Sequence, residues 1–252
     1  MKKLAKKIIR GIKRPILPVL DQVSLFRQNT KLRKFRNIHK DKDCVILGAG
    51  PSLNQVPHEF LDKCVVIGTN LSFKYYQPDY WFVMDTQFSW LDEGRKLCSD
   101  NNIPAFMNWL WASDKTNTIF ANEVTLHAHK ISVDQSPNNK QLIEQLTNAY
   151  NQPEYIEKKG FTCVNSVVSE GAIPMANYMG FKRIFLAGVD YYIPESGKFH
   201  FTDDTEKDVD ALNKLRTRIE KKYNTGEDLF GIKKWAYELI KDTKLNGKVF
   251  NL

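Results

Sequence analysis

Long apolar runs are missing from this sequence of 252 residues, since none approaches the roughly 20 residues that a membrane-spanning helix needs. Cysteine is scarce, and its four residues stand far apart without a C-x-x-C pair, which excludes a zinc ribbon and disfavours a disulfide framework. Cys44 and Cys64 lie beside apolar runs, so we interpret them as reduced core residues of a cytoplasmic protein. Repeats and low-complexity segments are also absent. With 42% hydrophobic and 26% charged residues, the composition is that of a globular domain and excludes disorder, collagen and coiled coil.

Acidic residues are almost absent from the first 40 positions. This segment holds 13 Lys or Arg residues and one acid, Asp21, whereas the remaining 212 residues hold 24 basic and 28 acidic residues. We therefore divide the chain into a basic arm, 1–40, and a mildly acidic body, 41–252.

Within the arm, Leu4, Ile8, Ile9 and Ile12 recur at helical spacing with lysines between them. A basic helix with one apolar stripe suits the surface of an anionic membrane. Charges interrupt the apolar residues too often for a secretory signal. We expect residues 1–36 to bind the inner face of the cell membrane, and we prefer this partner to an internal or oligomer contact and to nucleic acid.

The body alternates short apolar runs with helical segments. Continuous apolar runs of this length are typical of parallel strands buried on both faces, and the sequence predicts strands at Asp43–Leu47, Cys64–Gly68, Tyr80–Met84, Ile103–Met107, Val124–His127, Arg183–Val189 and Lys248–Asn251. Helices are expected at about 138–150, 165–179, 205–223 and 230–242. The predicted fold is an α/β, Rossmann-like, mostly parallel sheet with helices on both faces, which binds ligands outside the carboxyl ends of its strands.

Polar residues fall at those strand ends. The turn Gly48-Ala49-Gly50-Pro51-Ser52 follows the first strand, and its N–H groups can cradle a phosphate, although it lacks the third glycine of a dinucleotide fingerprint and the G-K-[ST] of a P-loop. Asn70, Asp85 and Asp190 follow later strands, where an amide or carboxylate can contact phosphate or ribose. At each position an ordinary turn or helix cap is the alternative.

His200 lies between Phe199 and Phe201 and is the best candidate for a general base, against the alternative of a half-buried structural histidine. His127 with His129 lacks a persuasive third ligand, and Asp208 with Asp210 falls in a charge-rich helical stretch. We predict no metal site from them.

Three segments in order, VILGAGPSL, VVIGTN with PDYWFVMD, and FKRIFLAGVDYY with FHF, resemble the bacterial lipooligosaccharide sialyltransferases and the motility-associated flagellin glycosyltransferases. The resemblance covers residues 43–225 and is shared with a pterin pyrophosphokinase-like group. It implies catalytic roles for His200 as base and Tyr192 as a phosphate contact. It also implies a donor-nucleotide site formed by Gly48, Ala49, Gly50, Pro51, Ser52, Asn70, Asp85, Asn165, Ser166, Gly188 and Asp190.

The chain departs from the sialyltransferase pattern at three places. Asp85 stands where those enzymes have an Asn, Thr162–Ser166 lacks the Arg-x-x-Ser-Gly motif, and Lys198 lies near the place of a second phosphate-contacting tyrosine. The resemblance implies an inverting, metal-independent glycosyltransferase that moves a sialic-acid-like sugar from a CMP donor to a glycan or lipid-linked acceptor. No cofactor is expected, and a homo-oligomer is left open. One alternative is an ATP-using, Mg²⁺-dependent pyrophosphokinase, with Asp85, Asp190, Asp203 and Asp204 near the metal. The other is a non-catalytic scaffold at the membrane surface.

Overall fold

The computed structural model describes residues 25–26, 28–83, 90–108, 123–126, 140–162, 166–190, 200–202 and 236–252, with backbone alone at 108 and 123–126. Most of the basic arm and the predicted helix at 205–223 lie outside these residues.

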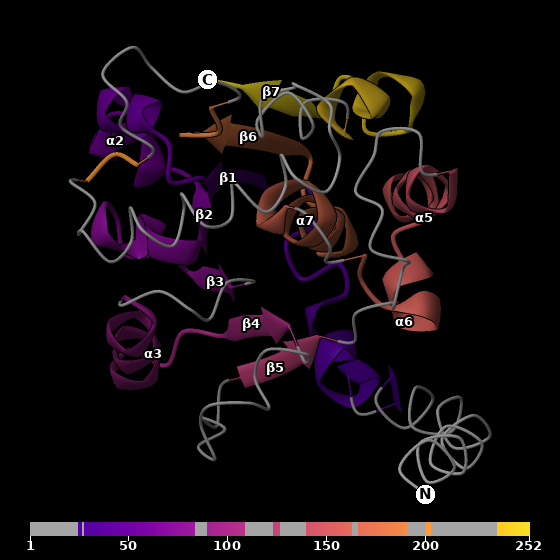
Figure 1. The fold of residues 1–252 in the computed structure, drawn as a ribbon, viewed down its shortest axis with the longest axis horizontal. Coiled ribbons are helices and arrows are strands. Elements are labelled where there is room, and N and C mark those ends of the chain that lie inside the picture. Colours follow the sequence, from indigo (N-terminus) through magenta and orange to yellow (C-terminus); the bar gives the residue numbers. More distant parts are fainter. Residues whose placement is uncertain are drawn as a thin grey trace, which may run out of the picture.

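A single sheet of seven strands organises the described chain, in the order β5-β4-β3-β2-β1-β6-β7 (Figure 1). Every pair of neighbouring strands is parallel, which confirms the predicted fold class. All seven predicted strands form, with bounds that differ by a few residues: β1 (Asp43–Leu47), β2 (Val65–Thr69), β3 (Tyr80–Val83), β4 (Ala105–Asn108), β5 (Glu123–Leu126), β6 (Arg183–Ala187) and β7 (Val249–Asn251).

Helices cover both faces of the sheet. Figure 1 shows α2 and α3 on one side and α5, α6 and α7 on the other. The first layer contains η2 (Pro51–Gln55), α2 (His58–Leu61), η3 (Asn70–Lys74) and α3 (Leu91–Asp100). The second contains η1 (Arg33–Phe35), α5 (Lys140–Asn151), α6 (Tyr155–Lys159), η4 (Val167–Ala172), α7 (Ile173–Tyr178) and η5 (Leu239–Asp242).

The strands read as continuous apolar runs because both of their faces are covered. In β1, Cys44 and Ile46 pack into the cluster beneath α7, whereas Val45 and Leu47 pack into the cluster beneath α2. Alternate side chains of a strand point to opposite faces, so neither face of β1 tolerates a polar residue. The three described cysteines, Cys44, Cys64 and Cys98, are free, and burial raises the pKa of the Cys44 thiol.

The predicted helix at 165–179 is divided in two. Its first part, η4, is a π-helix, and its second part, α7, begins at Ile173 and carries Pro174 in its first turn. Proline has no N–H to donate and its ring crowds the carbonyl four residues earlier, here that of Glu170. A π-turn widens the backbone at this point, which accommodates the proline without ending the helix.

The described part of the predicted arm packs against the body. Leu32 and Phe35 are buried in the same cluster as α5 and α7, and the carbonyls at the end of α7 accept hydrogen bonds from Asn37 and His39. No helix among the described residues has the length and apolar character required to cross a bilayer.

Candidate functional site

The strand order changes direction beside β1. The chain runs from β1 through β2, β3 and β4 to β5 on one side, and then returns to place β6 and β7 on the other side. In parallel sheets, ligands bind outside the carboxyl ends of the strands at such a switch point. Here the two segments that leave the switch point are Gly48–Ser52 after β1 and Gly188–Asp190 after β6.

Three hydrogen bonds join these two segments. The N–H of Gly48 donates to the carbonyl of Ala187 at 2.7 Å, and the N–H of Gly50 donates to that of Gly188 at 2.8 Å. The N–H of Ser52 donates to Oδ2 of Asp190 at 3.0 Å. The site residues that the sequence takes from two distant segments are therefore neighbours, and their backbones hold one another in place.

Glycine is required where the two segments meet. A Cβ on Gly50 would overlap the carboxylate of Asp190. Gly188 has a φ of +66°, and a Cβ there would lie 2.7 Å from Cβ of Leu53. A side chain at either position would push the segments apart and move Asp190.

These contacts change the role that we expected for the turn. Its N–H groups at Gly48, Gly50 and Ser52 already donate within the protein, and Pro51 has none. In this conformation these three N–H groups are occupied within the protein, so the predicted cradle of successive N–H groups is not formed by them. Among the side chains of Gly48–Ser52 and Gly188–Asp190, the half-buried Asp190 is the one charged group.

His200 lies next to the same turn. The following residue, Phe201, donates its N–H to the carbonyl of Ala49 at 2.9 Å, and its own carbonyl accepts from the side chain of Asn54 at 3.0 Å. The ring of Phe201 also packs edge-on against Tyr75. These contacts place the half-buried His200 beside the turn that follows β1.

Asn70 occupies the adjacent strand end. It has a φ of +47°, and its carbonyl accepts from Nε1 of Trp81 at 2.7 Å. The preceding Thr69 forms a capping box with Ser72 and donates its hydroxyl to the carbonyl of Leu47 at 2.7 Å. This bond ties the end of β2 to the end of β1. Asn70 therefore lies at the same sheet edge as Gly48–Ser52, which we call the glycine turn.

The other predicted site residues are placed differently. Tyr192, Asp85 and Asn165 lie outside the described residues. Ser166 is the N-cap of η4, where its side chain accepts from the N–H of Ser169 at 3.2 Å, and η4 packs over β2 and β3 on the α7 face. Ser166 is thus a helix cap in this structure.

One acidic residue near this edge was missed by the sequence reasoning. Glu170 is only 1% exposed and lies in η4, directly before Gly171, which packs over Phe82 near the end of β3. A single carboxylate within an otherwise apolar helix was the available signal. Buried carboxylates and π-turns both occur preferentially at functional sites.

Metal ligands do not cluster in the described part of the chain, since no three His, Cys, Asp or Glu residues there can hold one ion. Three of the four acidic residues proposed for magnesium, Asp85, Asp203 and Asp204, fall outside it. Asp190 is the fourth.

Comparison with protein families bears on this geometry. A family model described as 6-hydroxymethylpterin diphosphokinase MptE-like matches residues 20–196. The chain belongs to this MptE-like family. The matched span contains β1 to β6, the glycine turn and Asp190, and so includes the whole of the switch point.

Membership of the MptE-like family places the chain with transferase-type enzymes and favours the pyrophosphokinase alternative. It gives no support to the predicted sialyltransferase-like glycosyltransferase. His200 lies beyond the matched span, whereas Tyr192 lies within it. A search of curated proteins finds no match to the chain.

Proposed function

We propose that this protein is a diphosphokinase that transfers the diphosphate of ATP to the hydroxymethyl group of a pterin-like acceptor. The match of residues 20–196 to a family described by that activity carries the proposal. The switch point lies within the matched span, and the carboxyl ends of the strands at such a point are where a parallel sheet of this kind takes a nucleotide.

The residues at the switch point have separate roles in this proposal. The glycine turn, fixed by its bonds to Ala187 and Gly188, forms a preorganised wall against the nucleotide. The amide of Asn70 donates to a phosphate oxygen, which stabilises the negative charge that develops there. The carboxylate of Asp190, positioned by the N–H of Ser52, faces the same edge.

The reaction that follows is a displacement at phosphorus. The acceptor hydroxyl oxygen attacks the β-phosphorus of ATP, and the bond from that phosphorus to the oxygen bridging the α-phosphate breaks. AMP leaves with that oxygen, and the hydroxyl proton passes to a base. We assign this role to His200, because its neighbour Phe201 is bonded to Ala49 of the turn, and phosphoryl transfer otherwise depends on positioning and electrostatics.

Nucleoside triphosphates are used as magnesium complexes, and the donor set fits this requirement. Magnesium commonly takes one or two protein carboxylates together with substrate phosphates and water. One oxygen of the Asp190 carboxylate accepts a hydrogen bond from the N–H of Ser52, and its other oxygen can serve as such a ligand. When bound, Mg²⁺ neutralises charge on the β- and γ-phosphates.

Product analysis tests the proposal directly. The full chain is incubated with ATP, MgCl₂ and 6-hydroxymethylpterin, and the nucleotides and pterins are separated by chromatography. We expect AMP and a diphosphorylated pterin in equal amounts, with no ADP. The Asp190→Asn variant should lose this activity, whereas Asp62→Asn, an exposed carboxylate after α2, should retain it.

The same preparation separates the alternatives. Transfer from a CMP-activated sugar without metal would overturn the proposal in favour of a glycosyltransferase. A thermal-shift panel of ATP, CMP, UDP and GDP, with and without Mg²⁺, completes the test, since a ligand at 100 times its dissociation constant stabilises by about 2.7 kcal/mol. A chain that binds no nucleotide would be a scaffold.

A further inference from the structure

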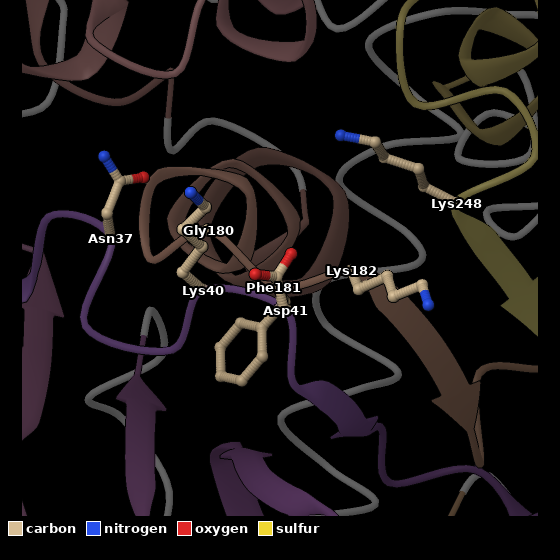
Figure 2. Close-up of a pocket in the computed structure, with 7 residues that line it drawn as sticks. All are labelled: Asn37, Lys40, Asp41, Gly180, Phe181, Lys182 and Lys248. Atoms are coloured by element: carbon tan, nitrogen blue, oxygen red, sulfur yellow. The ribbon is translucent and has the colours of Figure 1, made fainter.

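A second candidate site lies at the opposite edge of the sheet. A cavity of about 430 Å³ opens at the amino ends of β1, β6 and β7 (Figure 2), and it is lined by Asn37, Lys40, Asp41, Gly180, Phe181, Lys182 and Lys248. The three lysines precede three different strands. The proposed diphosphokinase site lies at the carboxyl ends of the strands, so this cavity is separate from it.

The cavity has an excess of positive charge. Three lysines and one aspartate line it, and none of the three lysines forms an ion pair with a described residue. Nearby, Arg183 is neutralised by Asp43 through two hydrogen bonds. Figure 2 shows the three lysine side chains on separate segments of the chain.

The lysines are not needed to cap α7, whose carboxyl end forms one wall. Its final carbonyls already accept from backbone N–H groups. Asn37 donates to Tyr178 at 3.1 Å and His39 donates to Met179 at 3.0 Å. The N–H groups of Gly180 and Phe181 donate to the carbonyls of Asn177 and Ala176. The lysine charges therefore remain available to an external anion.

The backbone beneath the lysines is held by hydrogen bonds. The N–H of Lys182 donates to the carbonyl of Lys42 at 2.7 Å, and the carbonyl of Lys248 accepts from Ile184 at 2.8 Å. The N–H of Lys40 donates to Asn37 at 3.3 Å. The backbone positions that carry the three lysine side chains are therefore held in place around the cavity.

We propose that this cavity binds the phosphate of an anionic lipid headgroup and docks the protein on a membrane surface. Lysine is a common phosphate ligand, and a volume of about 430 Å³ is within the range of small-molecule sites.

Exposed apolar residues and sequence continuity favour a lipid over a soluble phosphate. Residues 37–41 at the cavity rim directly follow the basic segment 1–36 in the sequence, Ile38 is 44% exposed, and Phe26 is 69% exposed. Basic residues next to exposed apolar side chains are the pattern of interfacial binding.

Vesicle sedimentation tests this assignment on the full chain. The vesicles contain phosphatidylcholine with about 30% phosphatidylserine, or phosphatidylcholine alone, in about 0.1 M salt. The test variant combines Lys40→Gln, Lys182→Gln and Lys248→Gln. The control combines Lys74→Gln, Lys96→Gln and Lys140→Gln, which are exposed residues that change the net charge equally.

Each lysine at an anionic surface is worth about fivefold in partition, so the test variant should bind about 100-fold more weakly. The control variant should remain within about threefold of the wild type, because Lys74, Lys96 and Lys140 lie outside the cavity. Equal losses in both variants would show that net charge alone acts, and would overturn the proposal. Calorimetry with inorganic phosphate that detects cavity-dependent binding, while vesicle binding is unaffected, would overturn the lipid assignment.

Discussion

The carboxylate of Asp190 accepts a hydrogen bond from the backbone N–H of Ser52 at 3.0 Å, although the two residues are 138 positions apart in the sequence. This bond joins the loop after β6 to the loop after β1 at the point where the strand order changes direction. It fixes both the acidic side chain and the first turn of η2. The hydrogen bond from Ser52 thus links the position of the Asp190 charge to the conformation of the loop after β1.

Substitution of Asp190 can separate its charge from its hydrogen bond. Asp190→Asn keeps an oxygen that accepts from Ser52, so we expect a stability change below about 1 kcal/mol but a loss of about 100-fold in turnover. Asp190→Ala leaves the Ser52 N–H without its acceptor and should cost about 1–3 kcal/mol. Urea unfolding and AMP release measure the two effects. Unchanged turnover in Asp190→Asn would remove the carboxylate from the reaction.

Gly188→Ala should destabilise the fold more than Gly247→Ala, which also places an alanine at a positive φ. Gly188 has a φ of +66° and Gly247 a φ of +73°, so both substitutions cost about 1–2 kcal/mol in backbone strain. At Gly188 the new Cβ also meets Leu53, whereas nothing lies within 4 Å of Gly247. Unfolding free energies should therefore differ by about 1–3 kcal/mol, the ordinary cost of overpacking. Equal values would show that the close approach of the two loops is unimportant.

The sheet was predictable because its strands are buried on both faces. A strand such as Asp43–Leu47 must then be apolar along its whole length, and that run is visible without any knowledge of its neighbours. The candidate residues were also predictable as strand-end residues. Their pairing was not, because Ser52 and Asp190 meet only through the order of strands, which no local pattern encodes.

Features that depend on three-dimensional packing could not be predicted from the sequence. The π-turn at η4 follows from Pro174, yet a proline in the first turn of a helix predicts an ordinary start equally well. The lysine cavity joins residues that precede three strands, and each lysine taken alone is an ordinary surface residue. Sequence periodicity does not show that these three lysines line the same cavity.

The hydroxyl of Ser169 offers a test of buried polarity. Ser169 is fully buried, and its Oγ has no hydrogen-bond partner among the residues that the structure describes. Ser169→Ala should therefore be neutral or stabilise the fold by up to about 1 kcal/mol, since a buried unpaired hydroxyl is unfavourable. Ser72→Ala is the control, because its Oγ accepts from the N–H of Thr69 at 2.8 Å, and its loss should cost about 1 kcal/mol. A comparable loss at Ser169 would reveal a partner for its hydroxyl.

His39 should make the fold sensitive to acid. Burial, with a smaller effect of Lys42, lowers the pKa of His39 from its ordinary 6.5. The ring stacks on Phe181 and its Nε2 lies 2.8 Å from the hydroxyl of Tyr80. The unfolded chain therefore takes up this proton more readily, so the stability from neutral His39 is complete above pH 6.5 and is lost as the pH falls through the lower folded value.

His39→Gln removes this titration. Its urea midpoint should lie below that of the wild type at pH 7.5, and the difference should shrink as the pH approaches 5. His58→Gln, at an exposed histidine of α2, is the control and should follow the wild type at each pH. Parallel curves for wild type and His39→Gln would contradict the assignment of this acid sensitivity to His39.

Glu157 joins the N-terminal segment to the body, and its contacts should be unequal in strength. Its carboxylate accepts from the hydroxyl of Tyr178 at 2.7 Å, and it pairs with Arg33 at 3.3 Å and Arg36 at 3.7 Å. Burial, followed by the hydrogen bond to Glu157, raises the pKa of the Tyr178 hydroxyl. Arg33 and Arg36 are more than half exposed, so water screens their pairs.

Tyr178→Phe should therefore cost about 1.5–3 kcal/mol, the value of a hydrogen bond to a charged acceptor, while Arg33→Gln should cost less than about 1 kcal/mol. Urea unfolding at low and high salt separates the two interactions. The small Arg33 effect should vanish in high salt, and the Tyr178 effect should persist because its hydroxyl is shielded from solvent by the fold. A larger loss for Arg33→Gln than for Tyr178→Phe would mean that the exposed ion pairs hold residues 28–36 on the body.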